Sequence, residues 1–139
     1  PVKIYGYDQT RAFAYRDDGA AGTVLALESD VSDQQVYHIG NDEEITIEAL
    51  TQSIGRIMGY AGGYEAAPTY PGSVARRCPD ISKARKQLRY NPTVSLETGL
   101  RQTVAWYREF FGSGKTIQSG GFKAPEDLDF DRRCEKETR

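Results

Sequence analysis

The chain has 139 residues, of which 38% are hydrophobic and 27% are charged, and its formal net charge is −2. This length supplies one domain, the composition is typical of a globular protein in water, and no apolar run approaches the roughly 18 residues of a membrane span. The slightly acidic balance argues against nucleic-acid binding, because phosphate contacts need a net basic face.

The cysteine and histidine content predicts neither a disulfide framework nor a metal site. Cys78 and Cys134 are far apart and lack metal-type spacing, and His38 is the only histidine. We therefore expect free thiols in a reducing, cytoplasmic environment and structural roles for Cys78 and His38. The chain opens at Pro1 directly with a strand-like sequence. We expect it to be a processed chain or a piece of a longer protein.

The N-terminal segments predict short strands around one helix. Residues 1–16 mix aromatic and β-branched residues with turn formers, which predicts one or two short strands. Asp17 or Asp18 can then cap a helix that runs to about residue 28, because apolar residues recur there at helical spacing. Residues 36–40, with the sequence VYHIG, predict another strand.

The clearest helix follows Thr46. Thr46 is a suitable N-cap, Glu48 lies in the positive first turn, and Gly59 is a suitable stop. Between them runs one apolar stripe, made of Ile47, Leu50, Ile54, Ile57 and Met58. A short strand is predicted over residues 64–67.

Two further helices are predicted after residue 79. Asp80 is a suitable cap for a short helix with Ala84 and Leu88 on its apolar side. Ser95 is a suitable cap for a last helix that ends at Gly112, in which apolar residues repeat at helical spacing. Beyond it, residues 113–139 form a polar tail with few apolar anchors, which we expect to be mobile or draped over a partner.

The sequence shows no self-contained catalytic chemistry. The sequence GSGKT at 112–116 resembles the end of a phosphate-binding loop, but Glu109 stands where that motif needs its first glycine. The segment also follows a predicted helix, whereas such a loop follows a strand. No combination of nucleophile, base and oxyanion donor emerges.

Three arginines at predicted turns remain as candidates for binding an anion. Arg11 lies in DQTRAF, and Arg76 and Arg77 lie in ARRCPD. Guanidinium groups suit phosphate because they make paired, charge-assisted hydrogen bonds. Composition alone leaves exposed surface charge as an equal alternative for each of them.

The order of the motifs resembles a known enzyme family. The succession IYG, QTRAFAYRDD, VYHIGN, ITIEALTQSI, PGSVARRCPDISKARKQLRYNP and VSLETGLRQTVAWYREFF is similar to the C-terminal half of extended short-chain dehydrogenase/reductases that act on nucleotide sugars. These are NAD-dependent epimerases and dehydratases and UDP-glucuronate decarboxylases. The resemblance implies an α/β fold with short strands and three or four helices, in which residues 1–112 bind the nucleotide sugar and the N-terminal Rossmann half is absent.

The resemblance also implies roles for the three arginines and for the Rossmann half of the family fold. In the family, the arginines that match Arg11 and Arg77 reach the substrate diphosphate, and Arg76 lies beside them. NAD is bound by the Rossmann half, which also supplies a catalytic tyrosine followed four residues later by lysine. No tyrosine here has lysine at that spacing, and no GxGxxG occurs. The resemblance thus assigns neither catalytic nor cofactor-binding residues to this chain, which should be inactive alone.

Three functions stay open at this point. An epimerase or dehydratase comes first, a UDP-glucuronate decarboxylase second, and a non-catalytic split or degenerate binding module third. In the family fold, the segments that match residues 17–28 and 36–40 pack on the Rossmann half. Without it, Val36 and Ile39 should be exposed, so we expect a complementing partner, oligomerisation or instability.

Overall fold

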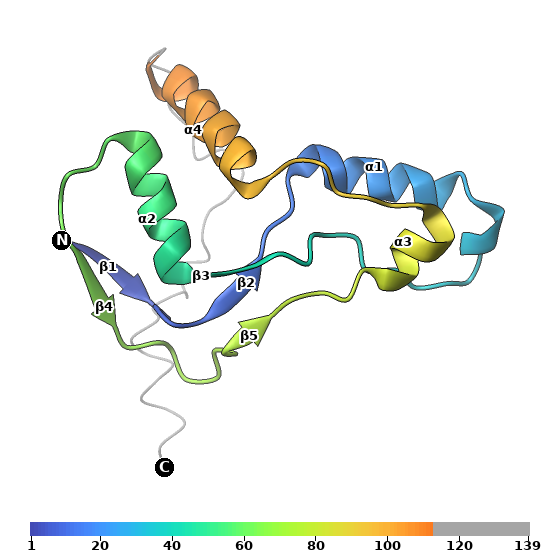
Figure 1. The fold of residues 1–139 in the computed structure, drawn as a ribbon, viewed down its shortest axis with the longest axis horizontal. Coiled ribbons are helices and arrows are strands. Elements are labelled where there is room, and N and C mark those ends of the chain that lie inside the picture. The colour runs from blue at the N-terminus through green and yellow to red at the C-terminus, as the bar shows by residue number, and fades with distance from the viewer. Residues whose placement is uncertain (113–139) are drawn as a thin grey trace, which may run out of the picture. The chain divides into compact units, whose positions relative to one another are not determined.

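The structure is a computed structural model that describes residues 1–112. Residues 1–106 form one compact unit, and a second begins at Tyr107 within the last helix. Short strands and helices are interspersed along the chain (Figure 1), which confirms the predicted α/β class. No helix among the described residues is long and apolar enough to cross a membrane.

A two-stranded parallel sheet joins β1 (Val2–Tyr5) to β4 (Tyr64–Ala67). Both strands are where the sequence predicts them. Ile4 is the buried residue of β1, with 3% of its surface exposed. Helix α2 (Ile47–Met58) contacts β1, so one helix lies against this small sheet.

A three-stranded sheet holds the segments with the candidate arginines. Its central strand, β2 (Thr10–Ala12), pairs antiparallel with β3 (Glu44–Thr46) and parallel with β5 (Arg76–Arg77). The prediction that these arginines lie at turns was wrong. Strands of two and three residues that pair with distant segments carry too few residues for a local alternation pattern.

Helix α2 has the predicted ends. The Thr46 side-chain oxygen accepts a hydrogen bond of 3.1 Å from the Ala49 N–H, as an N-cap does. At the other end Gly59 adopts a left-handed conformation with a φ of 75°, which glycine permits without steric cost.

Helix α1 (Arg16–Leu27) begins two or three residues earlier than a cap at Asp17 or Asp18 predicts. Its N-cap is Tyr15, so the prediction that Asp17 or Asp18 caps this helix was wrong. Asp18 is buried and bonds a distant segment, residues 93–94, instead of the N-terminus of its own helix.

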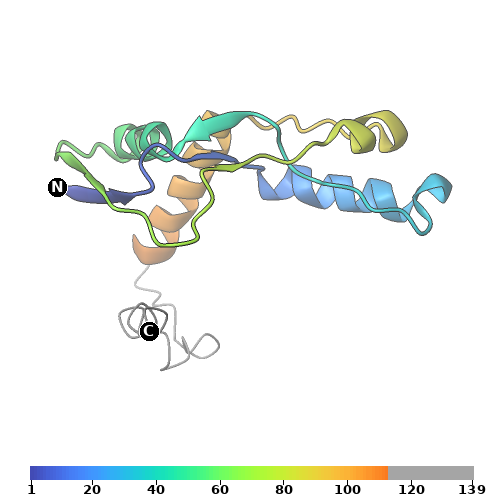
Figure 2. The ribbon, with the colours of Figure 1, turned by 90° about the horizontal axis from the view of Figure 1, so that it is seen from below.

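Helix α3 (Ser82–Leu88) lies beside α1 (Figures 1 and 2). The prediction that Asp80 is its N-cap was wrong by one residue: the cap position is Ile81, while Asp80 Oδ1 accepts from the Ser82 N–H at 2.9 Å. The core of the chain lies here, in a cluster of four buried residues: Ile81, Ala84, Leu88 and Tyr90.

The predicted strand at residues 36–40 is not formed. No described strand runs beside it, so it has no partner strand with which to form a ladder of hydrogen bonds. Val36 is 78% exposed, as predicted. Ile39, however, packs against the core cluster, which corrects the prediction that it is exposed. The Tyr90 hydroxyl fixes this segment by donating to the Gly40 carbonyl oxygen at 2.7 Å.

The last helix, α4 (Leu96–Gly112), has the predicted cap. Ser95 Oγ accepts from the Thr98 N–H at 3.2 Å. An ion pair of 2.9 Å between Arg56 and Glu97 joins α2 to α4. The GSGKT sequence after its first glycine and the predicted tail, 113–139, lie outside the described residues.

Candidate functional site

The register of the β2–β5 pair decides which arginines share a face. Arg11 is the partner of Arg77, and Thr10 is the partner of Arg76. Side chains alternate between the two faces along a strand, and registered partners point to the same face. Arg11 and Arg77 therefore lie on one face of the sheet, and Arg76 lies on the opposite face with Thr10.

Arg76 is already paired with a carboxylate. Its Nε lies 3.0 Å from both carboxylate oxygens of Glu44, and its Nη2 lies 2.5 Å from Oε2. Thr10 Oγ1 donates to the same carboxylate at 2.7 Å. The hydrogen bonds from Arg76 lower the pKa of Glu44, and the carboxylate raises the pKa of Arg76. The charge of Arg76 is thus neutralised within the sheet.

Arg11 is held by neutral groups. Its Nη2 donates to Gln9 Oε1 at 2.8 Å and its Nη1 donates to the Thr10 carbonyl oxygen at 2.7 Å, with a longer approach of 3.5 Å to the Ala75 carbonyl oxygen. No carboxylate among residues 1–112 pairs with it. The guanidinium has five N–H donors, and these contacts use at most three. Its charge and at least two donors stay available to an anion.

Arg77 is exposed and makes no ion pair or hydrogen bond with its side chain in the part of the chain that the structure describes. The shared face therefore carries two cations, Arg11 and Arg77, that no described carboxylate compensates. Two guanidinium groups on one face can each make paired hydrogen bonds to one phosphate group. This arrangement is suited to an anion that carries two phosphates.

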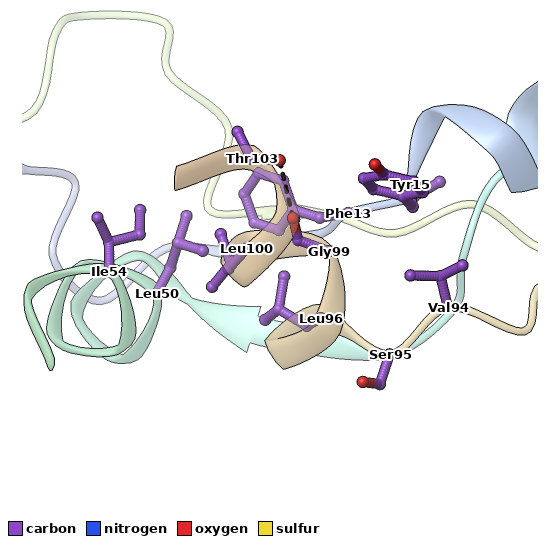
Figure 3. A pocket seen from close by; sticks show the side chains of 11 residues that line it. Phe13, Tyr15, Leu50, Ile54, Val94, Ser95, Leu96, Gly99, Leu100 and Thr103 are labelled. Atoms are coloured by element: carbon purple, nitrogen blue, oxygen red, sulfur yellow. Dashed lines mark hydrogen bonds between the residues drawn. The ribbon is translucent and has the colours of Figure 1, made fainter. Parts of the chain in front are cut away.

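A separate cavity lies between α2, α4 and the segment after β2. Its volume is about 280 Å³ (Figure 3). Leu50 and Ile54 of α2 line one side, and Leu96 and Leu100 of α4 line another. The Thr103 hydroxyl at its edge already donates to the Gly99 carbonyl oxygen at 2.8 Å. Its lining is mostly apolar, with the hydroxyl groups of Ser95 and Thr103 among its few polar groups.

The remaining candidate groups have structural contacts. His38 Nδ1 lies 3.2 Å from the Asp80 carbonyl oxygen, and Cys78 Sγ lies 3.6 Å from the Asp42 carbonyl oxygen. Within residues 1–112, no group of three histidine, cysteine or acidic side chains could hold a metal ion.

The sequence interpretation missed two residues next to the arginines. Gln9 is 7% exposed and contacts Arg11, and Glu44 contacts Arg76. The first could have been found, because Gln9 and Arg11 are two residues apart and a strand places such residues on one face. The second could not, because Glu44 reaches Arg76 only across the central strand.

Comparisons with known proteins indicate the same family as the sequence motifs. No family model matches the chain. A UDP-N-acetyl-alpha-D-glucosaminuronate decarboxylase of Bacillus cytotoxicus is 30% identical over 113 residues, which are 76% of this chain and 35% of that protein. A UDP-glucuronate 4-epimerase of Thermodesulfobacterium geofontis is 33% identical over 85% of this chain and 36% of that protein.

Solved structures give the same result. The UDP-glucuronic acid 4-epimerase of Bacillus cereus, in complex with UDP-glucuronic acid and NAD, matches with a TM-score of 0.72 and 35% identity. The match covers 79% of this chain and 36% of that one. The chain belongs to the extended short-chain dehydrogenase/reductases, in the NAD-dependent epimerase/dehydratase group, and it spans about a third of the length of the relatives it matches.

Proposed function

We propose that this chain is the substrate-binding part of an NAD-dependent enzyme that acts on a nucleotide sugar, and that Arg11 and Arg77 hold the substrate diphosphate. The observation that carries this proposal is the shared face of the two arginines, which the register of β2 and β5 creates. The Bacillus cereus structure contains UDP-glucuronic acid and NAD together, which supports a nucleotide sugar as the ligand.

The residues present indicate which ligand this chain holds and which ligand the rest of the enzyme holds. Two guanidinium groups on the diphosphate hold the linkage between nucleoside and sugar, so that the sugar is oriented for reaction. When bound, NAD supplies hydride transfer. This chain contains no glycine-rich dinucleotide motif, so NAD is assigned to the part of the relatives that the chain does not match. The reaction we favour is epimerisation, with UDP-glucuronate decarboxylation second.

Alanine substitution of each arginine tests the site. In the full-length protein that carries this chain, we expect Arg11→Ala and Arg77→Ala each to weaken UDP binding about 10- to 100-fold, because charge-assisted hydrogen bonds are lost. Arg76→Ala is the matched control and should leave the affinity within about threefold, because its partner is Glu44. Calorimetric titration measures all three. Equal affinities for wild type, Arg11→Ala and Arg77→Ala would contradict the site.

A second feature supports the proposal that this chain packs against a partner. Four apolar side chains are exposed at the C-terminal end of α1 and in the segment after it. Their exposed fractions are 48% for Val24, 85% for Leu27, 58% for Val31 and 78% for Val36. Apolar side chains exposed along one stretch of the chain are typical of an interaction surface. We propose that the NAD-binding part of the enzyme covers them, whether it lies on the same polypeptide or on a complementing chain.

The isolated 139 residues test this second proposal. We expect the isolated chain to associate, or to unfold without a cooperative transition, because the NAD-binding part that would bury its exposed apolar side chains is missing. Light scattering coupled to size exclusion, followed by urea titration, measures both. The double variant Leu27→Ser/Val36→Ser should associate less. A monodisperse, cooperatively unfolding monomer of the unaltered chain would contradict the need for a partner, and would favour an independent binding module.

A further inference from the structure

We infer that Gln9 is a positioning residue that presents Arg11 to the anion and fixes the loop leading to Arg77. This inference rests on the proposed function and deepens it. Gln9 itself needs no contact with the ligand.

The Gln9 side chain is buried, with 7% of its surface exposed, yet its amide makes three side-chain hydrogen bonds. Its Oε1 accepts from Arg11 Nη2 at 2.8 Å and from Ser73 Oγ at 3.0 Å. Its Nε2 donates to Thr69 Oγ1 at 3.1 Å. A buried amide satisfied in this way has little freedom to rotate.

The orientation of this amide follows from its partners. A guanidinium group can only donate hydrogen bonds, so the Gln9 atom that faces Arg11 must be the oxygen. The nitrogen must then face Thr69, whose hydroxyl can accept. The two halves of the amide therefore have different tasks: the oxygen holds Arg11, and the nitrogen holds the loop.

The loop from Thr69 to Ala75 links this amide to the second arginine. It is tied to Gln9 through Thr69 and Ser73, and its last residue, Ala75, accepts a hydrogen bond of 2.9 Å from the Thr10 N–H. Strand β5 follows at once and carries Arg77. The buried Gln9 side chain thus links the two segments that supply the cationic face, which are the strand with Arg11 and the loop that leads to Arg77.

The neutral charge of the amide matters for an anion site. A carboxylate at position 9 would also accept from Arg11, but it would compensate the positive charge that the anion needs. It would also lose the donor to Thr69. An amide holds the guanidinium and leaves its charge intact.

Calorimetric titration of UDP into the full-length protein tests Gln9, with Gln9→Met as the variant of similar size that removes the hydrogen bonds. We expect the affinity for UDP to fall about tenfold. In the Arg11→Ala background, the same change should lower the affinity by less than about threefold, because the part of its effect that passes through Arg11 is lost and only the part that passes through the loop to Arg77 remains. A residue with only a structural role would give the same loss in both backgrounds, and that result would overturn the inference.

Gln9→Glu is the second variant, for use if Gln9→Met does not fold. It keeps the size and the acceptor, and we expect it also to weaken UDP binding about tenfold, because the carboxylate neutralises Arg11. Unchanged affinity in Gln9→Glu would contradict the inference. The outcomes separate the two claims: if Arg11→Ala has no effect, the proposed function fails, whereas an effect of Arg11→Ala without an effect of either Gln9 variant removes only the role of Gln9.

Discussion

Asp18→Ala is expected to lower the free energy of unfolding by about 3 kcal/mol or more, because the buried carboxylate accepts three hydrogen bonds. Asp18 is 7% exposed and accepts from the Thr93 N–H at 2.9 Å, from the Thr93 hydroxyl at 3.2 Å and from the Val94 N–H at 3.0 Å. Without the carboxylate, two backbone donors lose their partners. Urea unfolding of the full-length protein measures the change.

Thr93→Val is the matched control for this carboxylate. It removes only the hydroxyl donor and should cost about 1 kcal/mol. Similar losses in Thr93→Val and Asp18→Ala would show that the backbone donors do not depend on Asp18, and would contradict the assigned role.

The pH dependence of Asp18 gives an independent check. Burial alone would raise the pKa of this carboxyl, but the hydrogen bonds from Thr93 and Val94 outweigh it and lower the pKa below its usual value. A lowered pKa in the folded state means that the stabilisation is complete above the unfolded value of about 3.9 and is lost as the pH falls through the folded value. The stability difference between wild type and Asp18→Asn should therefore be larger at pH 7 than at pH 2.5. An unchanged difference would contradict this account.

Gly22→Ala is expected to destabilise the protein by about 1 to 3 kcal/mol, because α1 packs too closely on the core for a methyl group. A Cβ atom at Gly22 would lie 2.5 Å from Ile39 Cγ2 and 2.8 Å from Tyr90 Cε2. Tyr90 is 2% exposed, so its ring has little space to move. In an unconstrained helix the same substitution would instead stabilise.

Gly19 offers the matched control in the same helix. A Cβ atom there meets nothing within 4 Å, so Gly19→Ala should stabilise by about 0.5 to 1 kcal/mol through helix propensity. Thermal unfolding of the two variants compares the cost of packing a methyl group at position 22 with the gain in helix propensity at position 19. Stabilisation of both, or destabilisation of both, would contradict the packing of α1 on Tyr90.

The helices could be predicted because their signals are local. Thr46 and Gly59 bound α2, and the apolar stripe between them repeats at helical spacing. Asp18 lies near a helix start and has a typical capping side chain, so local rules assigned it to the wrong partner. The segment at 36–40 has strand composition but no described neighbour to pair with, and composition cannot supply a missing hydrogen-bonding partner.

The candidate site could be predicted only in part. The motifs selected Arg11, Arg76 and Arg77 together, because their residue types and order resemble a family site. The resemblance assigned the diphosphate to Arg77 and placed Arg76 beside it, but residue type alone could not separate two adjacent arginines, whose faces follow only from the register with β2. The pairing of Arg76 with Glu44 depends on three strands that are distant in sequence.

The most direct measurement is a crystal structure of the full-length protein with UDP and NAD. We predict that diphosphate oxygens lie within hydrogen-bond distance of the Arg11 and Arg77 guanidinium groups, and that Arg76 stays on Glu44. NAD should be bound outside the helices and strands that these 139 residues form. A diphosphate bound elsewhere, or held by Arg76 after release from Glu44, would contradict the central claim.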